Sequence, residues 1–317
     1  MKAYLGIDIG SLTTKIVILS ETGEVLTGLY LQTKGRPIEL IQEGLRKVAD
    51  SIPPGMEIAG AGTTGSGRHL AGVIIGADVI KNEITAHAVA ATMLVPGVQT
   101  IFEIGGQDSK IIILRNGIVT DFAMNTVCAA GTGSFLDQQA ARLNIPIHDF
   151  GELALQSKIP VRIAGRCTVF AESDMIHKQQ MGHSIPDLIR GLCDALVRNY
   201  LNNVGKGKEI LPPIVFQGGV AANVGIIASF ERALGMSLNI PEYSGVMGAI
   251  GAAQLAREEM AGRAGTRFKG FKISGLSYHT GCFECDGCSN VCEVVEIYEE
   301  EKIIGRWGSR CSKWDII

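Results

Sequence analysis

The residues best suited to chemistry run from Asn125 to Ser134 and read N-T-V-C-A-A-G-T-G-S. The second half, with Gly131, Thr132 and Gly133, is a small-residue loop that opens onto a helical pattern. Such a loop presents backbone N–H groups and the positive end of a helix dipole, so it suits phosphate. Cys128 lies three residues earlier, where the same dipole favours a metal-binding thiolate. We therefore expect one loop that touches both a nucleotide and a metal, although an isolated cysteine is more often inert and buried.

A second cysteine, Cys167, has a matching setting in residues 161–175, which read V-R-I-A-G-R-C-T-V-F-A-E-S-D-M. It follows Gly165 and precedes an apolar helical pattern, so it is also predicted at the start of a helix. Most iron–sulfur clusters need four cysteine ligands. A symmetric dimer would supply Cys128 and Cys167 twice and complete such a set.

Residues 3–19 read A-Y-L-G-I-D-I-G-S-L-T-T-K-I-V-I-L, which predicts two strands joined by a polar turn. Hydroxyls, a lysine and bare backbone at the tip can wrap phosphates, and Asp8 can hold Mg²⁺ through water. A plain hairpin with a polar tip is an equally good interpretation of this stretch alone. The candidate phosphate-binding residues are Gly10, Ser11, Leu12, Thr13 and Lys15.

An internal repeat favours the functional interpretation. Residues 102–114, F-E-I-G-G-Q-D-S-K-I-I-I-L, match residues 7–19, I-D-I-G-S-L-T-T-K-I-V-I-L, without gaps. The matched pairs include Gly10 with Gly105, Lys15 with Lys110, and Asp8 with Glu103. A hairpin that recurs in this way predicts two similar domains, with a nucleotide held in the cleft between them. In the second copy the candidate residues are Gly105, Gly106, Gln107 and Asp108.

Two later glycine-rich helix starts complete the predicted nucleotide site. Residues 210–223 form an apolar run that ends in G-G-V-A-A-N, and residues 241–253 read P-E-Y-S-G-V-M-G-A-I-G-A-A. Glycines there let backbone approach a flat group such as adenine or ribose. A helix packed tightly on a sheet is the competing interpretation. The candidate residues are Gly218, Gly219, Asn223 and Gly248.

After about residue 259 the sequence becomes rich in cysteine. Cys282, Cys285, Cys288 and Cys292 follow the spacing C-x2-C-x2-C-x3-C, and Cys311 follows a predicted hairpin over 294–307. Reduced thiols at this density indicate a metal site. The spacing is that of bacterial ferredoxins, although Glu293 stands where those have proline. We favour an iron–sulfur cluster, and zinc remains the alternative.

Composition limits the class of protein. The chain has 317 residues, which favours two domains, and a net charge of −3, which gives no case for nucleic acid or an anionic membrane. No apolar run reaches membrane length, and the charged start does not resemble a signal peptide. We therefore expect a cytoplasmic protein whose eight cysteines are reduced.

Taken together, these motifs resemble a known family. The repeated hairpins and G-G-V-A-A-N are similar to those of the sugar kinase, heat-shock ATPase and actin superfamily. Within it, G-G-Q-D-S-K, C-A-A-G-T-G and C-T-V-F-A-E-S resemble the ATP-dependent activators of 2-hydroxyacyl-CoA dehydratases and the related ATPase subunits of benzoyl-CoA reductases. The likeness covers roughly residues 3–258. The departure is Glu103, where the family has aspartate.

The resemblance implies an α/β fold of two duplicated actin-like domains around a nucleotide cleft, plus a small cysteine-rich extension. We expect domains at 1–95, 96–258, whose last helix can pack back on the first, and 259–317. It further implies ATP or ADP with Mg²⁺, and a homodimer with one [4Fe-4S] cluster bridged by Cys128 and Cys167. Electrons would come from ferredoxin or flavodoxin and pass singly to a partner metalloenzyme. Asp8, Gln107 and Asp108 would be catalytic.

Two other functions remain open from the sequence. A small-molecule kinase of the same superfamily would phosphorylate a sugar or an acid and would not need Cys128. A regulatory ATPase without redox chemistry would hold zinc in its extension. Iron with acid-labile sulfide would separate electron transfer from both.

Overall fold

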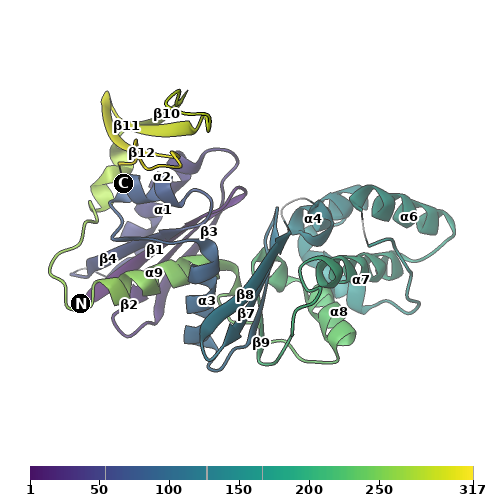
Figure 1. Cartoon of the computed structure of the whole chain (residues 1–317). Helices are drawn as coiled ribbons and strands as arrows, with labels where there is room; N and C mark the ends of the chain where they lie inside the picture. Colours follow the sequence, from purple (N-terminus) through teal and green to yellow (C-terminus); the bar gives the residue numbers. More distant parts are fainter. Residues whose placement is uncertain (54, 126–127, 166, 317) are drawn as a thin grey trace. The chain divides into compact units, whose positions relative to one another are not determined.

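The computed structural model describes residues 1–53, 55–125, 128–165 and 167–316. The chain forms two compact units (Figure 1). The first joins Met1–Ala90 to Gly248–Ile317, and the second is Ala91–Met247. Within the described ranges, every helix is too short or too polar to cross a membrane.

A five-stranded sheet forms the centre of the first unit, in the order β3-β2-β1-β4-β5. Strands β1 to β3 are antiparallel, whereas β4 and β5 run parallel to β1. The near-continuous apolar sequence of β1 is buried over seven of its eight residues, as expected for a strand covered on both faces. The strands are β1 Lys2–Ile9, β2 Thr13–Ser20, β3 Val25–Gln32, β4 Glu57–Thr64 and β5 Val79–Ile80.

Four helices accompany this sheet: α1 Pro37–Ser51, α2 Arg68–Ile75, α3 Glu83–Leu94 and α9 Met247–Glu259. Helix α9 returns from the end of the second unit and packs on β1 and β4 at very close range. A side chain on Gly6 or Gly62 would overlap backbone oxygens of α9. The sequence prediction allowed the last helix to pack back in this way, and the contacts show that small residues make the approach possible.

The second unit has a four-stranded sheet in the order β8-β7-β6-β9. Its strands are β6 Thr100–Ile104, β7 Ser109–Arg115, β8 Ile118–Asn125 and β9 Ile214–Gln217. Its helices are α4 Gly133–Arg142, α5 Phe150–Leu155, α6 Thr168–Gln180, α7 Ile185–Asn203 and α8 Val224–Leu234. An aromatic group from β6, β9, α7 and α8 fills the core, with ring centroids 5.1–5.3 Å apart: Phe102, Tyr200, Phe216 and Phe230.

The structure confirms that the hairpin recurs, and it extends the repeat. Asp8 lies opposite Lys15 in the antiparallel β1–β2 pair, and Glu103 lies opposite Lys110 in the β6–β7 pair. In each unit the first strand of the hairpin also pairs in parallel with a later strand, β4 or β9. The two sheets therefore share a four-strand order, and the acidic residue occupies the same position in both.

Tyr200 ties α7 to the second hairpin. Its side chain is fully buried, and its hydroxyl donates to the Lys110 carbonyl oxygen at 2.6 Å. Burial raises the pKa of this phenol, so it stays a donor. We expect Tyr200→Phe to lower the free energy of unfolding by about 1 kcal/mol, because a buried hydrogen bond is lost. Urea denaturation measures this, and an unchanged midpoint would contradict it.

The extension forms a three-stranded antiparallel sheet that belongs to the first unit (Figure 1). Its strands are β10 Tyr278–Glu284, β11 Glu293–Glu299 and β12 Lys302–Trp307, so the predicted hairpin over 294–307 is confirmed. The Trp307 ring stacks on His69 of α2 with centroids 6.2 Å apart. Before the sheet, Asp78 accepts from the Thr266 hydroxyl at 2.6 Å and from the Arg267 amide at 2.7 Å. The extension is thus anchored by packing and by hydrogen bonds.

Candidate functional site

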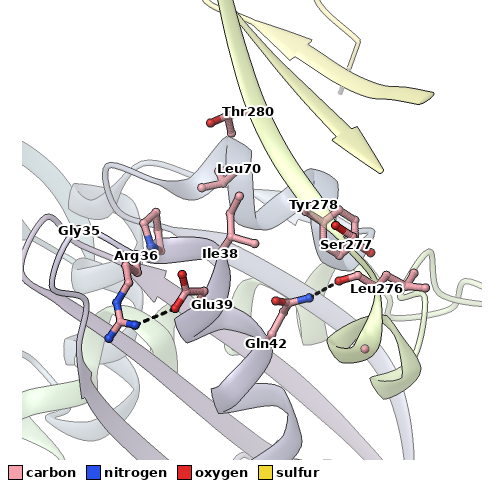
Figure 2. A pocket seen from close by; sticks show the side chains of 12 residues that line it. Gly35, Arg36, Ile38, Glu39, Gln42, Leu70, Leu276, Ser277, Tyr278 and Thr280 are labelled. Carbon is pink, nitrogen blue, oxygen red and sulfur yellow. Dashed lines mark hydrogen bonds and ion pairs between the residues drawn. The ribbon is translucent and has the colours of Figure 1, made fainter. Parts of the chain in front are cut away.

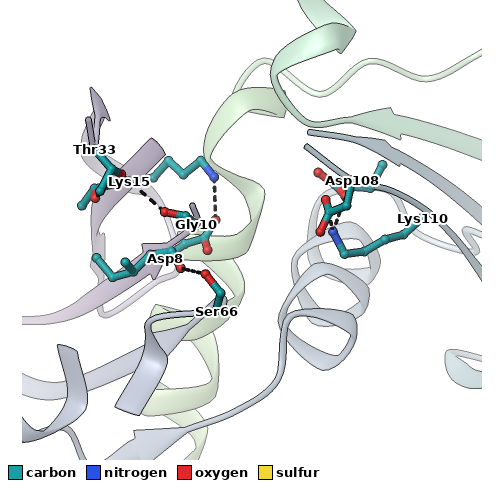
Figure 3. Close-up of polar contacts among 10 residues, drawn as sticks. Asp8, Gly10, Lys15, Thr33, Ser66, Asp108 and Lys110 are labelled. Carbon is teal, nitrogen blue, oxygen red and sulfur yellow. Dashed lines mark hydrogen bonds and ion pairs between the residues drawn. The ribbon is translucent and has the colours of Figure 1, made fainter. Parts of the chain in front are cut away.

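The tip of the first hairpin has the predicted polar turn. The Gly10 amide donates to the Thr13 carbonyl at 2.8 Å, which closes the turn around the exposed Ser11 and Leu12. Behind it, Asp8 is only 5% exposed and its carboxylate lies 3.0 Å from the Lys15 ammonium (Figure 3). A buried carboxylate in this position can hold a hydrated cation, and the polar turn beside it can hold a phosphate.

Two glycines keep the space beside Asp8 free of side chains. A Cβ on Gly248, in the first turn of α9, would lie 2.6 Å from Asp8 Oδ2. A Cβ on Gly65, after β4, would lie 2.5 Å from Asp8 Oδ1. Gly65 also has φ +87°, a conformation that favours glycine. Gly248 is among the predicted residues, whereas Gly65 is not, although the T-T-G-S-G run after a strand carried the signal.

The second hairpin repeats this arrangement with one more charge. The Gly105 amide donates to the Asp108 carbonyl at 3.0 Å, as Gly10 does to Thr13. The Lys110 ammonium, 2% exposed, lies 2.9 Å from Glu103 and 2.7 Å from Asp108. Gln107, at the turn, is exposed. The turn thus presents a half-buried carboxylate at Asp108 above a buried ion pair (Figure 3).

Gly218 occupies in the second unit the place of Gly65 in the first. It follows β9 with φ +91°, and a Cβ there would lie 2.9 Å from Glu103 Oε1. A glycine is therefore needed at position 218 because any side chain there would collide with Glu103 in the same unit. Gly219 is exposed in the next turn, and Asn223 accepts from the Ile226 amide at 3.1 Å as the N-cap of α8.

In the loop that precedes α4, three backbone amides already have partners within the protein. The Thr132 amide donates to Ala129 O at 3.0 Å, Gly133 to Gly105 O at 2.8 Å, and Ser134 to Gly106 O at 2.9 Å. The Ser134 hydroxyl also donates to Gly106 O at 2.6 Å. The Gly133 and Ser134 bonds fasten the start of α4 to the turn of the second hairpin.

Cys128 is half-buried and precedes a short 3₁₀ turn, η1 Ala129–Gly131, rather than α4 itself. Cys128 thus lies near a helix start, as the sequence predicted, but it caps the 3₁₀ turn, and α4 begins only at Gly133. The side chain of Asn125 holds its backbone: it donates to Cys128 O at 2.9 Å and accepts from the Cys128 amide at 3.2 Å. Thr126 and Val127, within the same sequence motif, lie outside the described residues.

Cys167 is the N-cap of α6, so its predicted position at a helix start is confirmed. Its carbonyl accepts from the Ala171 amide at 2.9 Å, and its side chain is half-buried. Val169 and Phe170 follow it, and each is 67% exposed. Arg166 lies outside the described residues.

Asn199 of α7 links the two cysteine segments, and the sequence did not predict it. Its side chain is buried and donates to Gly165 O at 2.7 Å, two residues before Cys167. A Cβ on Gly131 would lie 2.9 Å from Asn199 Oδ1, so the same side chain also packs against the turn that follows Cys128. One buried amide is thus hydrogen-bonded to the Cys167 segment and lies against the turn that follows Cys128.

The remaining cysteines fall into two groups. Cys193, in α7, is fully buried, and burial raises its pKa to about 12, which is typical of an inert core thiol. In the extension Cys285 is buried, Cys292 is half-buried, and Cys282, Cys288 and Cys311 are exposed. The indole N–H of Trp314 lowers the pKa of Cys285, with a smaller contribution from the Gly287 amide. In the described ranges no three histidine, cysteine or acidic side chains converge as a metal site.

A pocket of about 630 Å³ lies in the first unit, between the start of α1 and the segment that enters β10 (Figure 2). Its wall includes Glu39, Leu70 and Tyr278, and Gln42 closes one side by donating to Leu276 O at 2.7 Å. None of the residues predicted to bind nucleotide or metal lines this pocket.

The chain is similar to known proteins over most of its length. The (R)-2-hydroxyglutaryl-CoA dehydratase activating ATPase of Acidaminococcus fermentans is 36% identical over 265 residues, which cover 81% of this chain and 98% of the relative. The crystal structure of component A of that dehydratase superposes with a TM-score of 0.75 at 34% identity, over 82% of this chain and all of that one. The activator of the 2-hydroxyisocaproyl-CoA dehydratase from Clostridium difficile, solved with bound ADPNP, gives 0.73 at 30% identity, over 82% and 96%. A family model matches residues 5–256, and the chain therefore belongs to the BadF/BadG/BcrA/BcrD ATPase family.

Proposed function

We propose that this protein is an ATP-hydrolysing iron–sulfur reductase. As a cytoplasmic homodimer it transfers low-potential electrons, one at a time, from ferredoxin or flavodoxin to a partner metalloenzyme of the 2-hydroxyacyl-CoA dehydratase type or another double-cluster protein. The observation that supports this most strongly is that backbone hydrogen bonds join the turn of the second hairpin directly to the start of α4. Relatives named as dehydratase activators support the choice of partner.

The two hairpin turns are the proposed phosphate-binding elements. Gly10 to Lys15 and Gly105 to Asp108 present small residues, hydroxyls and backbone amides, which suit phosphate oxygens. Asp8 and Asp108 would hold Mg²⁺ through water, and Mg²⁺ supplies charge neutralisation for the phosphates. Gln107, which is exposed at the turn, would orient the attacking water. Gly218, Gly219, Asn223 and Gly248 complete the proposed nucleotide contacts.

Cys128 and Cys167 suit a shared metal group. Each chain offers two half-buried thiols on segments that both lie against Asn199, and two chains together offer four. A [4Fe-4S] cluster bound by these four thiolates would supply one-electron transfer at low potential. The exposed Val169 and Phe170 beside Cys167 favour a second copy of the chain as the cover of this surface.

Hydrogen bonds and the chain itself connect the turn of the second hairpin, which is proposed to bind phosphate, to Cys128. Gly105 and Gly106 accept from the first residues of α4, and η1 leads back from there to Cys128. A parallel route runs through Ser109, which pairs with Asn125, whose side chain holds the Cys128 backbone. A change in the turn on hydrolysis therefore moves the backbone that carries the thiol. The dipoles of a helix or turn near a thiolate affect how strongly the thiolate binds metal and how well its negative charge is stabilised.

The test is the iron content of anaerobically purified protein. We expect Cys128→Ala to lower iron and acid-labile sulfide at least about tenfold, because loss of a ligand should cost no less than loss of a supporting hydrogen bond. Cys193→Ala is the matched control: the thiol is in the core and should keep the iron. Partner-stimulated ATP hydrolysis should fall with the iron. Unchanged iron in Cys128→Ala would refute the proposal.

A further inference from the structure

The extension lies beyond what the relatives share. The family model ends at residue 256, and the activator from Acidaminococcus fermentans is covered over 98% of its own length by 81% of this chain. Five of the eight cysteines nevertheless lie in the extension. Their role therefore has to be inferred from the extension itself, independently of the nucleotide site.

The strand pairing places Cys285 and Cys292 directly opposite each other. Glu284 pairs with Glu293 at the end of the β10–β11 ladder, and the Cys285 amide continues it by donating to Cys292 O at 2.9 Å. Opposite residues of an antiparallel pair place their side chains on the same face, with Cβ atoms about 4.5–5.5 Å apart. Two thiols are thus brought together by backbone geometry alone.

The same alternation places Cys282 on the other face. Successive side chains of a strand point to opposite sides, so Phe283 and Cys285 share a face that Cys282 does not. The ring of Trp314 packs edge-on to Phe283 with centroids 5.1 Å apart, and its indole N–H donates to Cys285 Sγ at 3.3 Å. Cys282 is paired with Val295 instead and is exposed.

The C-terminal segment that contains Cys311 lies on the face of Cys285. Besides the Trp314 contact, Arg310 donates to Asn290 Oδ1 at 3.5 Å, across the loop between the two paired cysteines. The segment is closed on itself, because Ser309 Oγ donates to Asp315 at 2.9 Å and accepts from the Trp314 amide at 3.3 Å. Cys311 lies within this turn, and its neighbour Arg310 contacts the loop that carries Cys288.

We propose that Cys285, Cys288, Cys292 and Cys311 form a closed four-thiolate zinc site, and that Cys282, although part of the ferredoxin-like run, is not a ligand. The spacing C-x2-C-x3-C with a distant fourth cysteine suits zinc, which takes four thiolates in structural sites. Thiolates on one ion lie about 3.8 Å apart for a zinc–sulfur bond of about 2.3 Å, which the facing pair Cys285 and Cys292 can reach. Cys288 and Cys311, both exposed, would turn inward to complete the set.

Charge and hydrogen bonding support this set of ligands. Four thiolates and one Zn²⁺ carry a net charge of −2, which needs nearby donors and cations. The Trp314 indole already donates to Cys285. The Lys313 ammonium lies over the Trp314 ring, 5.2 Å from its centroid. Because zinc is not redox active, the site fastens the C-terminus to the sheet and does not relay electrons.

The experiment compares three cysteine variants of the full-length protein by metal analysis. We expect Cys311→Ser to lower bound zinc at least about tenfold and Cys282→Ser to leave it unchanged. After exchange of zinc for Co²⁺, the thiolate-to-cobalt absorption should follow the same pattern. Cys288→Ser should behave as Cys311→Ser, so a folding defect peculiar to one variant does not decide the result.

Three results would overturn the proposal. Zinc lost in Cys282→Ser, zinc kept in Cys311→Ser, or iron with labile sulfide remaining on the extension of the Cys128→Ala protein would each contradict the assigned ligands or metal. The outcome is separate from that of the proposed function. Zinc reports on the extension alone, whereas the iron lost in Cys128→Ala reports on the proposed bridging cluster.

Discussion

Gly248→Ala is expected to lower ATP hydrolysis about 100-fold without unfolding the protein. The new Cβ would lie 2.6 Å from Asp8 Oδ2 and 2.9 Å from its Cγ. Asp8 cannot swing aside freely, because it is buried and paired with Lys15 at 3.0 Å. A displacement of about 1 Å in a positioned catalytic group costs about 100-fold in rate.

The loss of activity should not be accompanied by a loss of stability of similar size. Alanine is favoured over glycine in a helix by about 1 kcal/mol, which offsets part of the steric cost in the first turn of α9. Gly275→Ala is the matched control, because a Cβ there meets no atom within 4 Å. Steady-state hydrolysis and thermal unfolding of both variants check this. Near-native hydrolysis in Gly248→Ala would remove Asp8 from the proposed catalytic residues.

The repeat was the part of the fold most open to prediction, since residues 7–19 and 102–114 match position by position. The matching glycines Gly65 and Gly218 were not recognised as a pair. They follow β4 and β9, whose sequences E-I-A-G-A-G-T-T and I-V-F-Q have no common pattern. Their equivalence comes from parallel pairing with β1 and β6, a long-range contact that local sequence does not encode.

The candidate site was predictable where the signal was local. Cys167 has the glycine before it and the apolar period after it, and it does begin a helix. Asn199 was not predictable, because it lies inside an ordinary amphipathic helix and acquires its role only when that helix packs against both cysteine segments. In the extension, spacing alone suggested Cys282 as a ligand. Strand alternation, which depends on where the strand pairing begins, places Cys282 on the opposite face and so favours Cys311 as the fourth ligand.

Lys110→Met is expected to lower the free energy of unfolding by about 3–5 kcal/mol, the largest stability effect among these predictions. The ammonium is 2% exposed and lies within 3 Å of two carboxylates, Glu103 at 2.9 Å and Asp108 at 2.7 Å. Methionine keeps most of the volume but removes the charge. The Glu103 side chain, 7% exposed, would then be a buried anion without its ammonium partner, which is costlier than the loss of a surface pair.

Lys15→Met offers the matched comparison, because Lys15 occupies the same place in the first hairpin. Its side chain is 16% exposed, and the pair with Asp8 at 3.0 Å is less buried, so we expect a smaller loss of stability. The double variant Lys110→Met with Glu103→Gln should recover much of the loss, since it removes the buried anion together with its partner. Urea denaturation of the single and double variants measures the recovery. If the Lys110→Met variant and the double variant were equally destabilised, the loss of stability would come from packing around Lys110. The buried ion pair with Glu103 would then not be its cause.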